Sequence, residues 1–139
     1  MARFMAWHVD YFKATPSEQG RSALVEEGNI IDVGEALLIF ISFEKSDEVS
    51  ESRILDRAYN EISALANQLK IKTIVLNPFA HLFGDLADPQ VASRMTSELY
   101  DMLKNKGSFD THKMSFGRFY EIELKAKGHR LSRVSRSIT

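Results

Sequence analysis

The chain has 139 residues, of which 44% are hydrophobic, and a length of this kind suits one domain with a substantial core, which we expect to span residues 1–139. It contains no cysteine, which excludes disulfides, thiolate nucleophiles and cysteine-ligated zinc. The net charge is −1, and no apolar run approaches the roughly 20 residues that span a bilayer, so we expect a soluble cytoplasmic protein with no membrane partner.

Two apolar segments in the first third of the chain predict strands. Residues 2–12 mix aromatic and aliphatic side chains, and we expect this strand to end before Pro16 and Gly20. Residues 21–34 predict either a short strand or an irregular excursion. Residues 35–45, EALLIFISFEK, form an almost continuous apolar run, which is typical of a strand buried on both faces.

The middle of the chain predicts a strand–helix–strand unit. Apolar side chains in residues 50–70 recur at steps of three and four, which indicates an amphipathic helix with serines available to cap its start. Residues 71–76, IKTIVL, are short and β-branched and predict the next strand. The unit over residues 35–76 favours a right-handed crossover between two parallel strands.

The last third predicts a second helix and a final strand. Asp88 followed by Pro89 is typical of an N-cap and first turn, apolar side chains then recur over residues 92–103, and Gly107 is a natural C-terminal stop. Residues 115–129 alternate apolar and charged side chains, which predicts a half-exposed strand. These elements together predict an α/β fold.

The stretch TIVLNPFAHLFGDLADPQ, residues 73–90, brings a proline, aromatic side chains and a histidine to the end of a predicted strand. Strand ends that lead into helices are where open α/β folds place ligand sites. His81 could act there as a general base, or it could only order the loop. A base needs a nucleophile to activate, and no Ser–His–acid arrangement can be assigned from the spacing.

Three other features leave alternatives open. His8 and Asp10 could share a metal with His81, but ligands so scattered in sequence are a weak signal, and we predict no metal and no cofactor. The segment after Leu124 has five Lys or Arg and no acid, which fits either a solvated face or phosphate binding. The sequence FGRF at 116–119 could stack on a base or pack in the core beside a bulge.

The segments HVDYF, IFISFEK, PFAHL with LADP behind it, FGRFYE and KGHRLSRVSR follow one another along the chain. In this order they resemble the N-terminal editing domain of archaeal-type threonyl-tRNA synthetases, over essentially all 139 residues. The resemblance implies a D-aminoacyl-tRNA deacylase-like α/β domain with a mixed sheet and two main helices, which forms a homodimer. It also implies hydrolysis of serine wrongly esterified to threonine tRNA, with that tRNA's 3′ end and the remaining synthetase domains as partners.

A physical argument supports the need for such an activity. Serine and threonine differ by one methyl group, and a pocket gains only about 1–3 kcal/mol from a group of that size. A second site can remove errors if it admits serine and excludes the extra methyl. Pro78 would stiffen the wall of this site, and the small Ala80 would let the main chain approach the substrate closely.

The resemblance also carries over site residues one by one. It implies that Ala80 and His81 contact the reacting seryl group, and that the pocket includes Phe43, Pro78 and Phe79. The terminal adenosine would lie against Phe116, Gly117 and Phe119, where an aromatic face and a glycine allow stacking and close approach. His8 and Asp10 match the family's first strand but receive no role.

Two positions depart from the family's pattern, because its usual lysine falls at Tyr120 and its usual acid at Arg133. One hypothesis is a decayed editing domain that serves as a dimerisation or tRNA-binding module. The other is a working enzyme in which the 2′-hydroxyl of the RNA activates water and main-chain N–H groups stabilise the oxyanion. We favour the second because PFAHL and the Phe-Gly pair are intact; Tyr120 would then order water and Arg133 would hold phosphate. A D-aminoacyl-tRNA deacylase is a third possibility.

Overall fold

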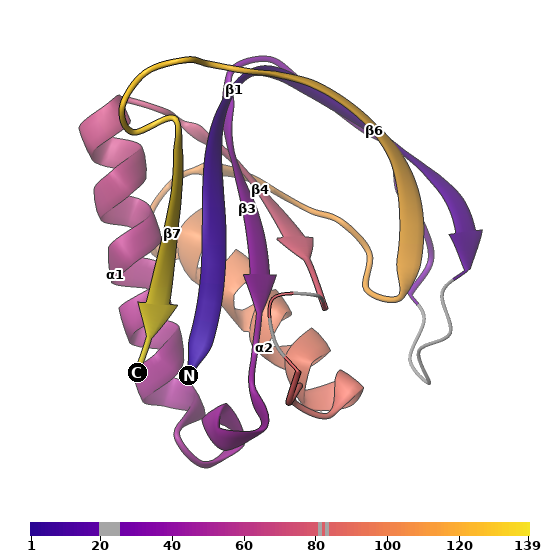
Figure 1. The fold of residues 1–139 in the computed structure, drawn as a ribbon, viewed down its shortest axis with the longest axis vertical. Helices are drawn as coiled ribbons and strands as arrows, with labels where there is room; N and C mark the ends of the chain where they lie inside the picture. The colour runs from indigo at the N-terminus through magenta and orange to yellow at the C-terminus, as the bar shows by residue number, and fades with distance from the viewer. Residues whose placement is uncertain (20–25, 81, 83) are drawn as a thin grey trace.

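The computed structural model describes residues 1–19, 26–80, 82 and 84–139, and in this part of the chain seven strands form one sheet (Figure 1). No helix among these residues has the length and apolar character needed to cross a membrane. The elements are β1 (Ala2–Gln19), β2 (Ile31–Val33), β3 (Ala36–Ser42), the 3₁₀ helix η1 (Lys45–Val49), α1 (Glu51–Leu69), β4 (Thr73–Pro78), α2 (Pro89–Asp101), the π-helical η2 (Met102–Lys106), β5 (Asp110–Lys113), β6 (Arg118–Ala126) and β7 (Arg133–Ile138).

The sheet is mixed, as the resemblance implied. The long strand β1 pairs antiparallel with β2, β3, β6 and β7. The pairs β3–β4 and β4–β5 are parallel. The predicted parallel unit from β3 through α1 to β4 is therefore confirmed, and so are the two main helices.

The prediction that the first strand ends before Pro16 is wrong, because β1 continues to Gln19. Pro16 pairs with Tyr120 of β6 and lies beyond Ala14, the last residue of β1 that pairs with β2. Within the described part of the chain, this end of β1 has a partner on one side only, and its register shifts between Pro16 and Gln19. Sheets accept proline at such edges and irregularities, where an amide N–H is not required.

A bulge at Asp10 divides β1 into two halves whose side chains alternate in opposite phase. The pairing with β6 shifts register between Val9 and Tyr11. Val9, Phe12 and Ala14 consequently pack in the same buried cluster. In a regular strand, Phe12 would lie on the face opposite Val9, because the two positions differ by three. One inserted residue reverses the alternation of a strand, so the bulge keeps apolar side chains on one face along the whole of β1.

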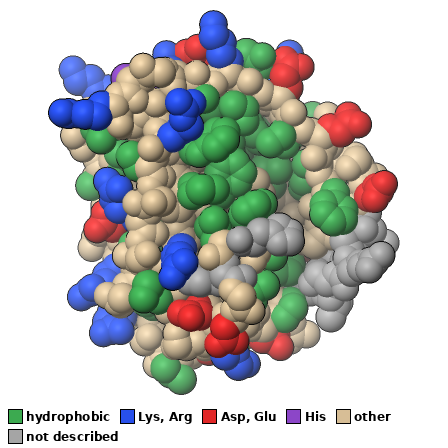
Figure 2. All heavy atoms as spheres, viewed as in Figure 1, with side chains coloured by type: hydrophobic (Ala, Val, Ile, Leu, Met, Phe, Trp, Pro, Cys, Tyr) green, Lys and Arg blue, Asp and Glu red, His purple; other side chains and the backbone are tan. Residues whose placement is uncertain are grey.

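Each face of the sheet carries its own apolar core. The first, the helix-side core, combines α1 and α2 with alternate residues of β1 and β3, such as Phe4 and Ile39. The second, the open-face core, lies on the opposite side and includes Leu38, Phe40 and Val75. Every residue of β3 is buried, as predicted for a strand covered on both sides. Figure 2 shows hydrophobic side chains gathered in the middle of the open face.

The second helix begins and ends where expected. Gly107, the predicted C-terminal stop, is required there for its small size and does not adopt the left-handed conformation. The Asp88 carboxylate accepts a hydrogen bond from a first-turn N–H at 2.9 Å. Gly107 follows η2 with φ −86°, and the left-handed conformation falls on Ser108, with φ 58°. Glycine is required at 107 by packing, because a Cβ there would lie 2.7 Å from the Phe109 ring and 2.9 Å from the carbonyl oxygen of Leu103.

Two strands were not predicted. The strand β5 has the polar sequence DTHK, of which only Thr111 is buried, and pairs with β4. The strand β7 lies in the basic C-terminal segment and pairs with the first residues of β1. It is an edge strand in the described part of the sheet, so the basic segment is part of the fold. The predicted half-exposed strand is confirmed as β6, with bounds Arg118–Ala126.

The C-cap of α1 provides a test of the local energetics. Lys70 is exposed and holds the left-handed conformation, with φ 58° and ψ 40°. We expect Lys70→Gly to raise the free energy of unfolding by about 0.5–1 kcal/mol, because glycine adopts this conformation without a Cβ penalty. Urea denaturation measures the change. Lys70→Ala removes the same charge but keeps the Cβ, so an equal gain in that variant would contradict the conformational explanation.

Candidate functional site

The predicted PFAHL segment leaves the sheet at the end of β4. Pro78 pairs with Ile41 of β3, and the N–H of Phe79 donates to the Ile41 carbonyl at 2.9 Å, which extends the ladder by one residue. The Phe79 ring packs edge-on against Phe40, with ring centroids 5.5 Å apart, in the open-face core. Ala80 follows and is exposed. Phe79 is therefore fixed in place, while the next residue, Ala80, is exposed.

The loop that continues towards α2 is attached to β3 through Phe43. His81 lies outside the described residues, so its part in the site stays a prediction. The N–H of Ala87 donates to the Phe43 carbonyl at 3.0 Å. The Phe43 ring is only 3% exposed and packs in the helix-side core, on the face opposite Phe79. Phe43 therefore contributes its backbone to the loop, and its role as a pocket residue stays a prediction.

The turn at Phe116 and Gly117, which precedes β6, is held by Glu26. Gly117 has φ 80°, a conformation that favours glycine. The carbonyl of Phe116 accepts from the N–H of Glu26 at 2.9 Å, and the N–H of Phe116 donates to Glu26 Oε1 at 2.6 Å. Arg118 Nε donates to the Glu26 carbonyl at 2.9 Å. Three polar contacts from one residue thus fix the turn.

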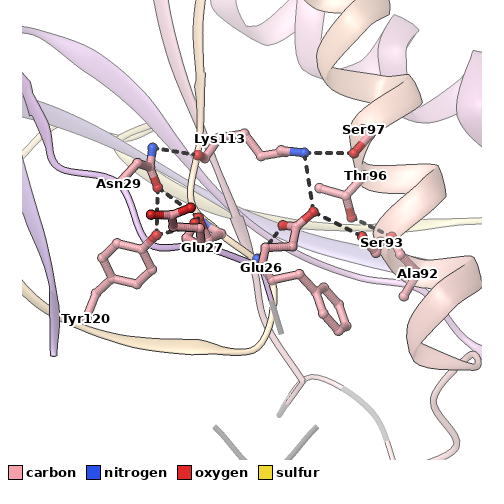
Figure 3. A network of polar contacts seen from close by, with 11 residues as sticks. Glu26, Glu27, Asn29, Ala92, Ser93, Thr96, Ser97, Lys113 and Tyr120 are labelled. Atoms are coloured by element: carbon pink, nitrogen blue, oxygen red, sulfur yellow. Dashed lines mark hydrogen bonds and ion pairs between the residues drawn. The ribbon is translucent and has the colours of Figure 1, made fainter. Parts of the chain in front are cut away.

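Glu26 also ties this turn to α2, as Figure 3 shows. Its Oε2 accepts from Ser93 Oγ at 3.4 Å and lies 4.0 Å from Lys113 Nζ. Lys113 Nζ in turn donates to Ser97 Oγ at 2.7 Å. The turn, the end of β5 and one face of α2 are therefore joined through a single carboxylate.

Tyr120 belongs to the same network (Figure 3). Its hydroxyl donates to Asn29 Oδ1 at 2.7 Å and accepts from the N–H of Ser115 at 2.8 Å. Asn29 Nδ2 donates to the Lys113 carbonyl at 3.1 Å, and the Tyr120 ring packs against the open-face core. A phenol has one donor and two acceptor positions, so one acceptor position of Tyr120 remains after these contacts.

Residues Glu26 and Asn29 were not predicted as site residues. They lie in the segment 21–34, whose sequence shows no clear periodicity, and their partners are about 90 positions away in the chain. No local pattern marks such a contact. The sequence offered one signal, the polar side chains close to Gly28. In the structure, a Cβ added at Gly28 would lie only 2.6 Å from the Pro16 side chain.

The remaining predicted residues lie on different faces. Arg133 pairs with Trp7, so its side chain projects from the open face, because cross-strand partners share a face. Phe119 is 57% exposed and alternates with Tyr120, so it points away from the open-face core. The structure thus brings Phe79, Tyr120 and Arg133 to one face, and leaves Phe43 and Phe119 off it.

The pair His8 and Asp10 belongs to a separate polar cluster. His8 is buried, with Nδ1 2.8 Å from His129 Nε2 and Nε2 2.7 Å from Glu35 Oε2. Asp10 forms an ion pair with Lys127 at 2.5 Å, which lowers the pKa of the carboxyl and raises the pKa of the ammonium. These contacts join β1 to the β6–β7 connection. Among the described residues, no group of three or more potential ligands is arranged to hold a metal.

Comparisons with known proteins identify the family of the chain. A family model described as the archaea-specific editing domain of threonyl-tRNA synthetase matches residues 2–138. The threonine–tRNA ligase of Pyrococcus furiosus is 33% identical over 139 residues, which cover 98% of this chain and 22% of that protein. The ligase of Thermococcus sibiricus is 34% identical over 142 residues, with the same coverage. The chain thus spans about a fifth of the length of these relatives, and it belongs to the family of archaea-specific editing domains of threonyl-tRNA synthetase.

Proposed function

We propose that this chain hydrolyses L-serine from wrongly charged threonine tRNA and spares L-threonine. The observation that supports this most is the intact PFAHL segment at the end of β4, within a match to the editing family over residues 2–138. The small difference between the two amino acids requires a wall that does not yield to one methyl group. Phe79 meets this requirement, because its N–H and its ring are both held by β3.

The reaction follows from the ester itself. A water oxygen attacks the seryl carbonyl carbon, and the bond between that carbon and the ribose oxygen breaks. The ribose oxygen takes up a proton, so the products are serine and a free ribose hydroxyl. The neighbouring 2′-hydroxyl positions the water. Since the N–H of Phe79 is already bound to Ile41, the main-chain donors for the oxyanion come from Ala80 and His81.

The proposed adenosine contacts depend on the turn before β6. Phe116 offers a ring and Gly117 allows close approach of the backbone, and Glu26 holds both in place. Phe119 points outward from β6 and is the weakest of the three predicted adenosine contacts. Tyr120 would order the attacking water through its remaining acceptor position. A homodimer and the remaining synthetase domains are proposed partners on the ground of family membership.

A binding module without turnover is the second candidate, and one observation favours it. The Tyr120 hydroxyl stands where the family has its usual lysine, and it is engaged by Asn29 and Ser115 within the fold. A group so engaged can be purely structural. This reading predicts affinity for the tRNA or dimerisation, and no hydrolysis.

The direct test is deacylation of L-seryl and L-threonyl esters of threonine tRNA by the 139-residue chain. We expect loss of serine, retention of threonine, and no loss of serine from a substrate whose terminal ribose lacks the 2′-hydroxyl. Turnover of neither ester would favour the binding module. Cleavage of a D-aminoacyl ester on an unrelated tRNA would assign the chain to D-aminoacyl-tRNA deacylation instead.

The role of Tyr120 can be separated from its packing. If its hydroxyl orders water, Tyr120→Phe should lower kcat by about 100-fold with little change in KM, because a loss of about this size follows when a reacting group is misplaced by about 1 Å. Asn29→Ala removes the main partner of this hydroxyl and leaves the hydroxyl in place, so it should cost far less. Equal losses in single-turnover assays of the two variants would make Tyr120 a structural residue.

The position of the Phe116–Gly117 turn should depend on Glu26. We expect Glu26→Ala to raise KM about tenfold with little change in kcat, because it removes an acceptor of the kind worth about 1.5 kcal/mol from a turn that only binds substrate. Glu26→Gln keeps an oxygen for the Phe116 N–H and should restore most of the affinity. The exposed neighbour Glu27 provides the control as Glu27→Ala. Unchanged KM in Glu26→Ala would refute the placement of the adenosine at this turn.

A further inference from the structure

The turn between β6 and β7 is joined to β1 by two histidine rings in series, which the proposed reaction does not use. His8 of β1 is buried, and its Nδ1 lies 2.8 Å from Nε2 of the exposed His129 in the turn. The other nitrogen of His8, Nε2, lies 2.7 Å from Glu35 Oε2. The other nitrogen of His129, Nδ1, accepts from the Leu131 N–H at 3.2 Å. These contacts form one chain from the Leu131 amide to the Glu35 carboxylate.

The two ends of this chain determine where the protons lie. A carboxylate only accepts hydrogen bonds, so Nε2 of His8 carries a proton, and a neutral His8 then accepts at Nδ1. His129 must therefore donate from Nε2, which leaves its Nδ1 to accept from the Leu131 amide. With both rings neutral and in the Nε2–H tautomer, every contact in the chain has one proton.

One added proton breaks this order at a single place, the Leu131 contact. The rings then carry three protons on four nitrogen atoms, while the contact between the rings and the contact with Glu35 each need only one. The third proton falls on Nδ1 of His129, opposite an amide that can only donate. A proton on Glu35 gives the same result. His8 then accepts at Nε2 and donates from Nδ1, so His129 must carry its proton on Nδ1.

Charged groups of both signs surround the two rings. The Glu35 carboxylate lies 3.9 Å from Lys127 Nζ, and Lys127 forms the 2.5 Å ion pair with Asp10. Lys127 lowers the pKa of the Asp10 carboxyl, with a smaller contribution from Lys125, and Arg130 follows His129 in the turn. Because His129 is exposed and His8 is buried, solvent protons reach the chain of contacts at His129.

We propose that the His8–His129 pair is a pH-sensitive switch in the turn before β7: the neutral pair holds the Leu131 amide, and one added proton releases it. The rest of the turn is held independently, because Ser132 donates to the His129 carbonyl through its N–H at 3.0 Å and its hydroxyl at 2.6 Å. The switch therefore opens the turn locally, just before Arg133, and leaves β7 paired with β1. The alternative is that the rings only fill the joint between β1 and the turn, with no response to pH.

NMR spectroscopy of the 139-residue chain tests the switch. At neutral pH, we expect proton–nitrogen correlation spectra of the rings to show both His8 and His129 as the Nε2–H tautomer. Histidines gain their charge between about pH 8 and pH 5, and over this range the two rings should respond together to the first proton. The protection of the Leu131 amide against hydrogen exchange should then fall about fivefold, which corresponds to one neutral hydrogen bond. The Ser132 amide should keep its protection.

Two variants separate the switch from simple packing. His129→Gln keeps an N–H for His8 but cannot titrate, so it should remove the pH response of Leu131. Glu35→Ala removes the acceptor that fixes the tautomer of His8. It should therefore lower the protection of the Leu131 amide already at neutral pH, although Glu35 contacts His8 and not Leu131.

Asp32→Ala is the matched control, because Asp32 is an exposed acid of the neighbouring strand β2 and is not part of the chain of contacts. It should leave the Leu131 amide unchanged. An Nδ1–H tautomer in either ring at neutral pH would overturn the switch. So would constant protection of Leu131 while the wild-type rings titrate, or a pH response that persists in His129→Gln. The wild-type titration decides the matter even if a variant fails to fold, and it is independent of the proposed reaction because it uses neither RNA nor ester.

Discussion

The pairing of β1 with four other strands is the constraint on which the rest of the structure depends. One half of β1 lies between β3 and β7, and the other half lies between β2 and β6, so the strand must change partners along its length. The bulge at Asp10 makes this change possible without exposing apolar side chains. The backbone of His8 holds both sides of the change, because its carbonyl accepts from Lys127 and its N–H donates to Ser132, each at 2.8 Å.

This arrangement explains why the candidate site forms on the open face. The parallel strands β3 and β4 end together, and the chain leaving β4 keeps one more ladder bond through Phe79. The opposite wall comes from β6, which reaches the same core only because the bulged half of β1 carries it there. The helices cover the other face, and α2 reaches the network through two serines: Ser93 donates to Glu26, and Ser97 accepts from Lys113.

The sequence predicts those parts of the fold in which periodicity and burial agree. The two helices and the buried strand β3 have strong local patterns, and so does the alternation of β6. The end of β1 was predicted wrongly at Pro16. The cost of proline in a strand depends on whether a neighbouring strand needs its N–H, which the local sequence does not reveal. The strands β5 and β7 have polar sequences and become strands only by pairing with β4 and β1. For the site, the roles of the motif residues stay predictions, and the contacts of Glu26 and Asn29 were missed because they join distant parts of the chain.

The geometry at Phe79 suggests how discrimination and chemistry are divided between neighbouring residues in the proposed mechanism. A wall that rejects one methyl group must be rigid, and Phe79 is rigid because its amide is bound to Ile41. The same bond keeps that amide from stabilising an oxyanion, so in the proposed mechanism the donors come from later peptide groups, beginning with that of the exposed Ala80. A site of this kind takes its oxyanion donors from the main chain and leaves to a side chain only the ordering of water. The resemblance places the family's usual lysine at Tyr120, and this replacement is compatible with activity because the Tyr120 hydroxyl keeps an acceptor position after its bonds to Asn29 and Ser115.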